Sequence, residues 1–290
     1  MKKSINYWSF KRQHPIEAMK IAKDAGYDGI ELTIDTSTGL TPDTSVDELH
    51  LIREKAEKIN LAIPSVACSI HWQYSLVSDD PSERQQAYEI VVKQIKFASI
   101  LGSETILLVP GNVANIFVPD SPVVDYEKCW TRALSALDLL KHVAEEHDVQ
   151  IGVENVWNKF LLSPLEFKHF LDEVNSEYVG MYFDVGNVIA SGFPEQWIRI
   201  LGKYLQKVHF KDFRSDPGGL NCFVDLLAGD VNWPAVMQAL QDVNYDGWVT
   251  AEMTPYQYAS DQIIYNTAVS MDRIINQDFR IIFCACIDFR

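Results

Sequence analysis

Eight short runs of apolar residues recur along the chain, and each is followed by a longer segment in which apolar positions are spaced differently. Within each run nearly every position is apolar, rather than every second one, and this is typical of parallel strands buried on both faces. The runs predict strands at residues 5–8, 29–34, 63–69, 105–110, 151–155, 180–185, 207–212 and 248–253.

The segments between these runs carry helical signals. Apolar side chains at positions 88, 91, 95 and 98 are spaced by three or four residues, which places them on one face of a helix. Pro15 and Pro164 stand where a first helical turn would begin. Ser45, with Glu48 three residues later, forms a capping-box pattern. Strands and helices therefore alternate through the chain.

Eight such strand-then-helix units predict an α/β protein with a single (β/α)₈ TIM barrel spanning residues 1–277. An open doubly wound sheet is the competing fold, and it usually carries a GxGxxG turn after an early strand. The segments SFKR (9–12) and DTS (35–37) follow the first two predicted strands instead, and this favours the barrel. Residues 278–290 fit the preceding helical pattern poorly and are expected to form a C-terminal tail of unknown structure.

Composition narrows the function classes. The 290 residues include 40 acidic and 25 basic side chains, a net charge of −15, which repels polyanions and disfavours a nucleic-acid-binding protein. No apolar run approaches the length of a membrane span, and the first residues lack the apolar core of a signal peptide. Five cysteines without a CxxC pair indicate a reducing compartment, so a cytoplasmic protein is expected. Cys284 and Cys286 are interpreted as apolar tail residues.

Four polar residues close consecutive predicted strands at the end where barrel active sites form. They are Glu154, Asp184, His209 and Glu252. Each alone would be an ordinary rim or packed residue, but three carboxylates and one imidazole converging on one mouth repel one another unless a cation lies between them. This ligand set suits one divalent metal ion, Mn²⁺, Mg²⁺ or Co²⁺, and remains compatible with Zn²⁺.

These residues lie in strings that resemble the xylose-isomerase-like barrel superfamily. The strings are AGYDGIEL (25–32), VEN (153–155), FDVGN (183–187), VHFKD (208–212) and AEM (251–253), and the resemblance as a whole covers about residues 4–275. The order Glu, Asp, His, Glu resembles that of the ketose 3-epimerases, including the pentulose-5-phosphate 3-epimerases. The superfamily's DNA-repair nucleases carry additional histidines that this chain lacks, so DNA repair is not expected.

The resemblance implies a metal-dependent sugar or sugar-phosphate epimerase or isomerase, most simply a ketose 3-epimerase that works through a metal-chelated enediolate. It assigns Glu154 and Glu252 as the two catalytic acid–base groups, and Mn²⁺ as the expected ion. Asp184 and His209 would mainly hold that ion. Asn187 stands where the tagatose and allulose epimerases carry a sugar-binding His, so the sugar and its phosphorylation stay open.

Further polar and aromatic residues near the predicted strand ends are candidates for contact with the substrate: Tyr7, Trp8, Cys68, His71, Asn155, Trp157, Asn187 and Lys211. Aromatic rings stack on the C–H faces of sugars, but the same rings also serve as rim packing. Glu31 is a candidate for orienting a metal ligand or for a structural acid. Gly218 and Gly219, with Arg214, could form an anion-binding loop or simply a turn.

Two other functions remain open on the sequence alone. One is an inosose dehydratase-type lyase with the same metal, and the other is a non-catalytic sugar-binding barrel. In each case the partner is a small-molecule sugar or sugar phosphate, without nucleic acid or membrane. Barrels that resemble this one form homodimers or homotetramers, so self-association is expected.

Overall fold

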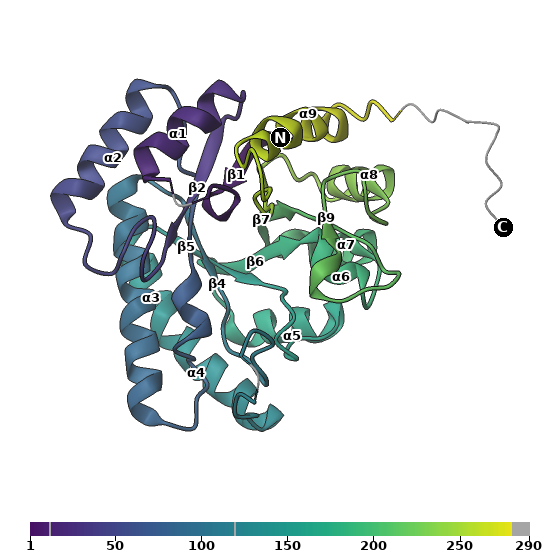
Figure 1. Cartoon of the computed structure of the whole chain (residues 1–290). Coiled ribbons are helices and arrows are strands. Elements are labelled where there is room, and N and C mark those ends of the chain that lie inside the picture. Colours follow the sequence, from purple (N-terminus) through teal and green to yellow (C-terminus); the bar gives the residue numbers. More distant parts are fainter. Residues whose placement is uncertain (12, 119, 280–290) are drawn as a thin grey trace.

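Eight parallel strands close into a barrel in a computed structural model that describes residues 1–11, 13–118 and 120–279. The strand order around the barrel is β1-β10-β7-β6-β5-β4-β3-β2, and the register is parallel throughout. Helices surround these strands on all sides (Figure 1). The predicted (β/α)₈ TIM barrel is therefore confirmed. The tail with Cys284 and Cys286 lies outside the described residues, except for its first two residues.

The barrel strands match the eight predicted runs to within a few residues. They are β1 (Lys2–Asn6), β2 (Gly29–Ile34), β3 (Ser65–Cys68), β4 (Thr105–Leu108), β5 (Gln150–Glu154), β6 (Val179–Asp184), β7 (Leu205–Phe210) and β10 (Trp248–Ala251). The first strand ends earlier than predicted, because Asn6 accepts a hydrogen bond from the backbone of Trp8 and starts a 3₁₀ turn, η1 (Tyr7–Ser9). Tyr7 and Trp8 thus lie in the turn above the strand.

Nine α-helices lie in the described part of the chain. They are α1 (Pro15–Asp24), α2 (Val46–Lys58), α3 (Pro81–Leu101), α4 (Tyr126–His147), α5 (Pro164–Val174), α6 (Val185–Ile189), α7 (Pro194–Leu201), α8 (Trp233–Asp242) and α9 (Gln262–Ile275). Pro15 and Pro164 start their helices as predicted, and Ser45 caps α2 by accepting a hydrogen bond from the backbone of Glu48. Within the described residues, no helix is long and apolar enough to span a membrane.

The main hydrophobic core lies between the strands and the surrounding helices. Fully buried side chains such as Met19, Phe167 and Phe170 come from the inner faces of the helices. The interior of the barrel holds only a small separate cluster, made by Ala67, Leu107 and Tyr182 with Trp8 beside it. This distribution leaves the inside of the barrel to polar side chains.

The segment after β7 departs from the predicted strand. Phe210 ends β7, and Asp212 instead begins a two-stranded antiparallel ribbon of β8 (Asp212–Phe213) and β9 (Phe223–Val224). The buried carboxylate of Asp212 accepts hydrogen bonds from the backbone of Leu227 at 2.9 Å and from the indole of Trp233 at 3.0 Å. One side chain therefore fixes the long loop that the sequence places between β7 and α8.

Replacing Asp212 by Asn should lower the free energy of unfolding by about 2–3 kcal/mol, because an amide nitrogen would face backbone and indole donors. Chemical denaturation of both proteins measures this difference. Asp216→Asn, an exposed position in the same loop, is the matched control and should change stability by less than about 0.5 kcal/mol. Equal stability of the two variants would contradict the role given to Asp212.

Candidate metal centre and active site

The four residues predicted as metal ligands meet at the carboxyl ends of four neighbouring strands. Glu154 and Asp184 are the last residues of β5 and β6, His209 is the second-last of β7, and Glu252 directly follows β10. One ligand atom from each lies within 4.8 Å of the others. We call this group the ligand cluster: Glu154, Asp184, His209 and Glu252.

The imidazole of His209 lies at the centre of the ligand cluster. Its Nδ1 is 3.3 Å from Glu252 Oε2, 3.5 Å from Glu154 Oε1 and 4.0 Å from Asp184 Oδ2. Asp184 and His209 are fully buried, and Glu154 is nearly so. Within the described residues, Nδ1 of His209 and Oδ2 of Asp184 have no hydrogen-bond partner. Buried polar atoms without partners, turned toward one another, are what an absent cation would leave.

The other ring nitrogen of His209, Nε2, contacts Glu31 on the side of the ring that faces away from the ligand cluster. Nε2 lies 2.9 Å from Glu31 Oε1, and both side chains are fully buried. The second carboxylate oxygen of Glu31 accepts hydrogen bonds from the hydroxyls of Ser65 and Tyr182, each at 2.6 Å. The side-chain amide of Asn6 donates a hydrogen bond to the first carboxylate oxygen, Oε1. With Nε2–H directed at Glu31, the free electron pair of Nδ1 points into the ligand cluster.

Charge coupling shapes the pKa values of this pair. Burial alone would raise the pKa of Glu31 and lower that of His209. The charge of each partner outweighs burial, so the pKa of Glu31 is lowered and that of His209 is raised well above its ordinary value. Glu31 is therefore a permanent carboxylate below the ligand cluster.

The carboxylates of the ligand cluster differ in their surroundings. Burial raises the pKa of Glu154, and the charges of Glu252 and Asp184 add to this effect. Burial also acts on Glu252, but Lys211 Nζ lies 2.9 Å from Glu252 Oε1 and, together with His209, lowers the pKa of this carboxyl. Glu252 is thus the more readily ionised of the two predicted catalytic groups.

The donor set fits a divalent cation. The ligand cluster and Glu31 bring four carboxylates together, and Lys211 is the cation beside them, since His209 is neutral when its Nδ1 serves as a ligand. The excess of negative charge in this buried site is unfavourable, and a divalent ion reduces it. Three carboxylate oxygens and one imidazole nitrogen are hard to borderline donors that suit Mn²⁺, Mg²⁺, Co²⁺ or Zn²⁺.

Asn155 and Asn187 hold the ligand cluster in place from the side. The amide of Asn155 donates to Asp184 O and accepts from Asp184 N, each at 2.8 Å. Asn187 donates to Asn155 O at 3.0 Å, and its backbone nitrogen donates to the Asp184 carboxylate at 2.8 Å. Both amides, which the sequence suggested for sugar contact, are therefore engaged with the backbone around Asp184.

Three of the remaining predicted contact residues line two cavities near the ligand cluster: Trp8, Trp157 and Lys211. The mouth cavity, of about 480 Å³, is lined by Trp8, Phe117, Lys211, Leu220, Asn221, Phe223, Val224, Asp225, Glu252, Met253, Thr254 and Pro255. A side cavity of about 470 Å³ is lined by Trp157, Lys159, Asn155 and Asn187 among mostly apolar neighbours. Trp8 and Lys211 thus lie beside Glu252, whereas Trp157 lies one cavity away and donates its indole N–H to Asn187 O.

Three predicted contact residues line neither of these cavities. The hydroxyl of Tyr7 donates to the carbonyl of Gln13, and Cys68 and His71 are buried at the end of β3 and in η2 (Ser69–Trp72). Burial lowers the pKa of His71 to about 4, so its ring is neutral near pH 7. In this structure the three side chains are therefore buried and do not line either cavity.

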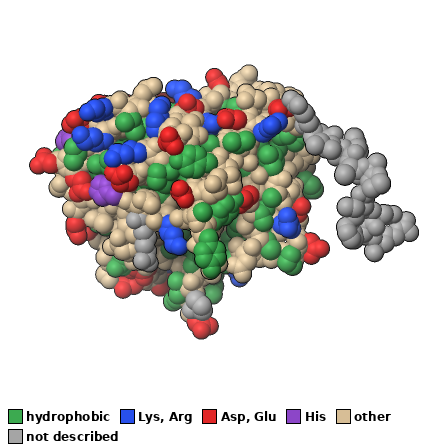
Figure 2. Space-filling view, turned by 45° about the horizontal axis from the view of Figure 1, so that its top comes forward, with side chains coloured by type: hydrophobic (Ala, Val, Ile, Leu, Met, Phe, Trp, Pro, Cys, Tyr) green, Lys and Arg blue, Asp and Glu red, His purple; other side chains and the backbone are tan. Residues whose placement is uncertain are grey.

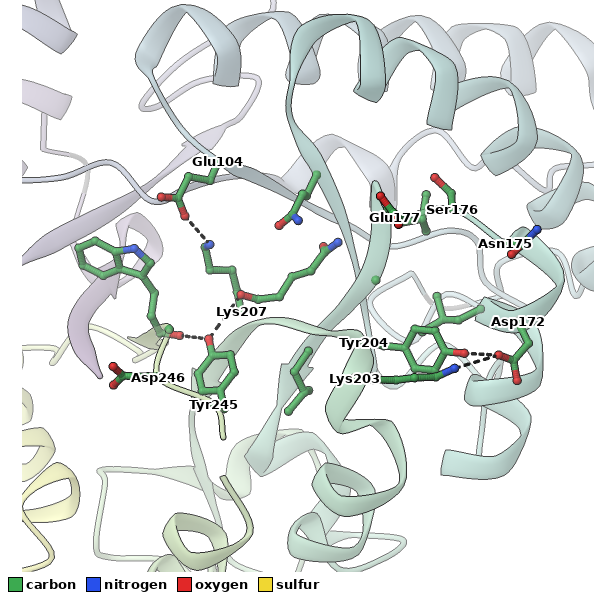
Figure 3. A pocket seen from close by; sticks show the side chains of 18 of the residues that line it. Glu104, Asp172, Asn175, Ser176, Glu177, Lys203, Tyr204, Lys207, Tyr245 and Asp246 are labelled. Atoms are coloured by element: carbon green, nitrogen blue, oxygen red, sulfur yellow. Dashed lines mark hydrogen bonds and ion pairs between the residues drawn. The ribbon is translucent and has the colours of Figure 1, made fainter. Parts of the chain in front are cut away.

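The largest cavity, of about 890 Å³, lies at the opposite end of the barrel, where the strands begin. Several of its charged groups are paired with one another: Lys207 Nζ lies 3.0 Å from Glu104, and Asp172 faces Lys203 and the hydroxyl of Tyr204 (Figure 3). The ligand cluster lies at the other end of the barrel, so the size of a cavity does not identify the candidate active site here.

The sequence alone did not identify the side chains that donate hydrogen bonds to Glu31, the partner of His209. Asn6, Ser65 and Tyr182 stand inside predicted strands and look like ordinary strand residues. One signal was available for Tyr182, since it is two residues before Asp184 and so faces the same side of β6. The pairing of Glu31 with His209 depends on barrel closure, which brings residues 178 positions apart together.

Adding Mn²⁺ at a hundredfold excess over its Kd should raise the Tm of the metal-free protein by about 5 °C, because the ion binds only the folded chain. Asp184→Asn should abolish most of this shift. Asp172→Asn, which makes the same change at the opposite end of the barrel, should retain it. Equal shifts in both variants would contradict a metal site at the ligand cluster.

Glu31→Gln should weaken Mn²⁺ binding about tenfold or more, because an amide nitrogen would face the donors that orient His209. Titration calorimetry measures the Kd directly. Glu104→Gln makes the same substitution on an exposed side chain of the opposite cavity and should leave the Kd unchanged. An unaltered Kd in Glu31→Gln would show that His209 does not need this partner.

Comparison with known proteins gives a consistent family. Residues 19–271 match a model of the xylose isomerase-like TIM barrel. A putative L-ribulose-5-phosphate 3-epimerase, SgbU, from Escherichia coli is 27% identical over 251 residues, which are 82% of each chain. The fold is similar to that of the IOLI protein with a zinc atom (TM-score 0.80, 18% identity, 97% of this chain and 100% of that one). It is also similar to D-psicose 3-epimerase from Clostridium cellulolyticum (TM-score 0.77, 18% identity, 94% and 97%). The chain belongs to the xylose isomerase-like TIM barrel family.

Proposed function

We propose that this protein is a metal-dependent sugar epimerase that inverts a ketose at C3. The observation that carries the proposal is the placement of Glu154 at the end of β5 and of Glu252 directly after β10, with β6 and β7 between the two strands and His209 at the centre. Inversion at carbon requires proton removal on one face and proton delivery on the other. Two carboxylates from separate strands on either side of the site can serve both faces.

The names of the relatives support the same reaction. UlaE is named an L-ribulose-5-phosphate 3-epimerase and SgbU a putative one, and similar folds belong to D-psicose 3-epimerase and L-ribulose 3-epimerase. A divalent cation held by the ligand cluster would polarise the ketose carbonyl and acidify the neighbouring C–H bond. We propose Mn²⁺ for this role, because hard oxygen donors predominate.

The side chains of this protein divide the remaining work. Lys211 keeps Glu252 ionised, so Glu252 is suited to take the C3 proton. Glu154, whose pKa is raised by burial, is suited to hold a proton on the other face. Asp184 and His209 hold the ion, and Glu31 orients His209. Removal and return of the proton take the ketose through an enediolate.

We also propose that the protein acts in the cytoplasm as a homodimer or homotetramer. The absence of a CxxC pair and the acidic composition support the compartment. Large apolar side chains exposed around the mouth, such as Phe117, Phe193 and Tyr258, support self-association. Sedimentation measures the oligomeric state directly.

Incubation of the Mn²⁺-loaded protein with ketoses and ketose phosphates in D₂O tests the reaction by NMR. We expect deuterium at C3 together with the C3 epimer, without loss of water. Glu154→Gln should lower kcat by about a thousandfold while sparing most Mn²⁺ binding, because it removes a proton-transfer group. The matched control, Glu173→Gln on the exposed face of α5, should keep the wild-type rate.

Two outcomes would contradict this proposal. Exchange at the wild-type rate in Glu154→Gln would remove that residue from the chemistry. Loss of water from a cyclic polyol, without C3 exchange in any ketose, would indicate a lyase of the inosose dehydratase type.

A further inference from the structure

We propose that the substrate is an unphosphorylated ketose, and that the mouth of this barrel excludes phosphate esters. The inference rests on the proposed function and separates this chain from the relatives named as phosphate epimerases. A phosphate monoester carries nearly two negative charges at pH 7 and needs several charged or N–H donors around it. Three features of the mouth work against such a group.

The first feature is the shortage of free cations in the mouth cavity. Its one lining cation, in the described part of the chain, is Lys211. Lys211 Nζ lies 2.9 Å from Glu252 and 3.7 Å from Asp184, and it also lies over the ring of Phe223 at 4.4 Å. The charge of Lys211 is therefore already engaged by the ligand cluster. Moving its ammonium group toward a phosphate would break its ion pair with Glu252.

The second feature is the character of the wall farther from the ligand cluster. Aromatic and aliphatic side chains predominate there, and the described residues that line the cavity include one acidic residue besides Glu252, which is Asp225. Phe117 is backed by Trp72 in an edge-to-face contact with ring centroids 4.7 Å apart. Such a wall suits the C–H faces of a sugar, whereas a dianion would meet apolar surface and a like charge.

The third feature is that two helix N-termini on the mouth side are already capped by the chain's own acids. Backbone N–H groups at such termini are the usual anion sites. Asp80 accepts a hydrogen bond from the backbone nitrogen of Ser82 on α3, and Asp125 accepts one from the backbone nitrogen of Lys128 on α4. A carboxylate thus occupies both of these positions, where a phosphate would otherwise bind.

The loop after β7 follows the same pattern. Arg214 donates to Ala228 O at 2.8 Å, and the backbone nitrogen of Ser215 donates to Asp230 at 2.7 Å. In the neighbouring side cavity, Lys159 is an exposed lysine among mainly apolar side chains. In the loop that the sequence left open as an anion site, Arg214 and the backbone of Ser215 are therefore engaged in internal contacts. Gly218 and Gly219 have positive φ angles and serve the turn.

The test compares kcat/KM of the Mn²⁺-loaded protein for pentuloses and hexuloses with kcat/KM for their terminal phosphate esters. We expect the free ketoses to be favoured at least tenfold. Equal or higher kcat/KM for the esters would overturn this inference while leaving the epimerase proposal intact. Loss of that ester activity in Lys159→Gln would then identify the anion site. C3 exchange in neither class of substrate would overturn both proposals.

A second test changes the charge of the mouth cavity and compares the ester-to-free ratio of kcat/KM between two protein variants, so that it does not depend on which sugar is used. Asp225→Asn removes the like charge and should raise the ester-to-free ratio of kcat/KM about threefold at low salt, with less effect at high salt. Asp246→Asn makes the same change on an exposed side chain at the opposite end of the barrel and should leave the ratio unchanged. An unaltered ratio in Asp225→Asn would contradict electrostatic exclusion at the mouth.

Discussion

The buried pair of Glu31 and His209 is the interaction on which the site depends. Two ionisable side chains are removed from water inside the barrel, and this is costly unless each is fully paired. Glu31 meets the condition by accepting from Ser65, Tyr182 and Asn6 as well as from His209. The result fixes both the tautomer and the direction of the imidazole, so Nδ1 is available to the ligand cluster before any ion arrives.

This pair also explains why the barrel interior is polar. Tyr182 reaches across to Glu31, and its ring packs against His209 with centroids 4.5 Å apart. Gly152 makes room for it, since a Cβ there would lie 3.0 Å from Tyr182 Cβ. The apolar core therefore lies outside the strands, against the helices, and stability and catalysis draw on separate layers of side chains.

The sequence predicted the eight strands and the four residues of the ligand cluster, because apolar runs and the polar residues that close them are local features. It did not predict the hydrogen bonds of Asn6, Ser65 and Tyr182, since these arise only when the barrel closes. Asn155 was predicted to contact the sugar, and its side-chain amide is held by two hydrogen bonds to the backbone of Asp184, a pairing that the sequence does not reveal. Side-chain direction, not residue type, decides such assignments.

The acidic composition acquires a structural meaning from these contacts. Asp80 and Asp125 cap helices, and Asp230 and Asp212 hold the loop after β7, so many carboxylates serve the backbone near the mouth. Acidic side chains are also scattered over the visible surface rather than gathered in one patch (Figure 2). A mouth built in this way would attract a small divalent cation and repel a dianion. The same carboxylates that stabilise the fold would therefore favour the metal ion and the uncharged sugar that we propose.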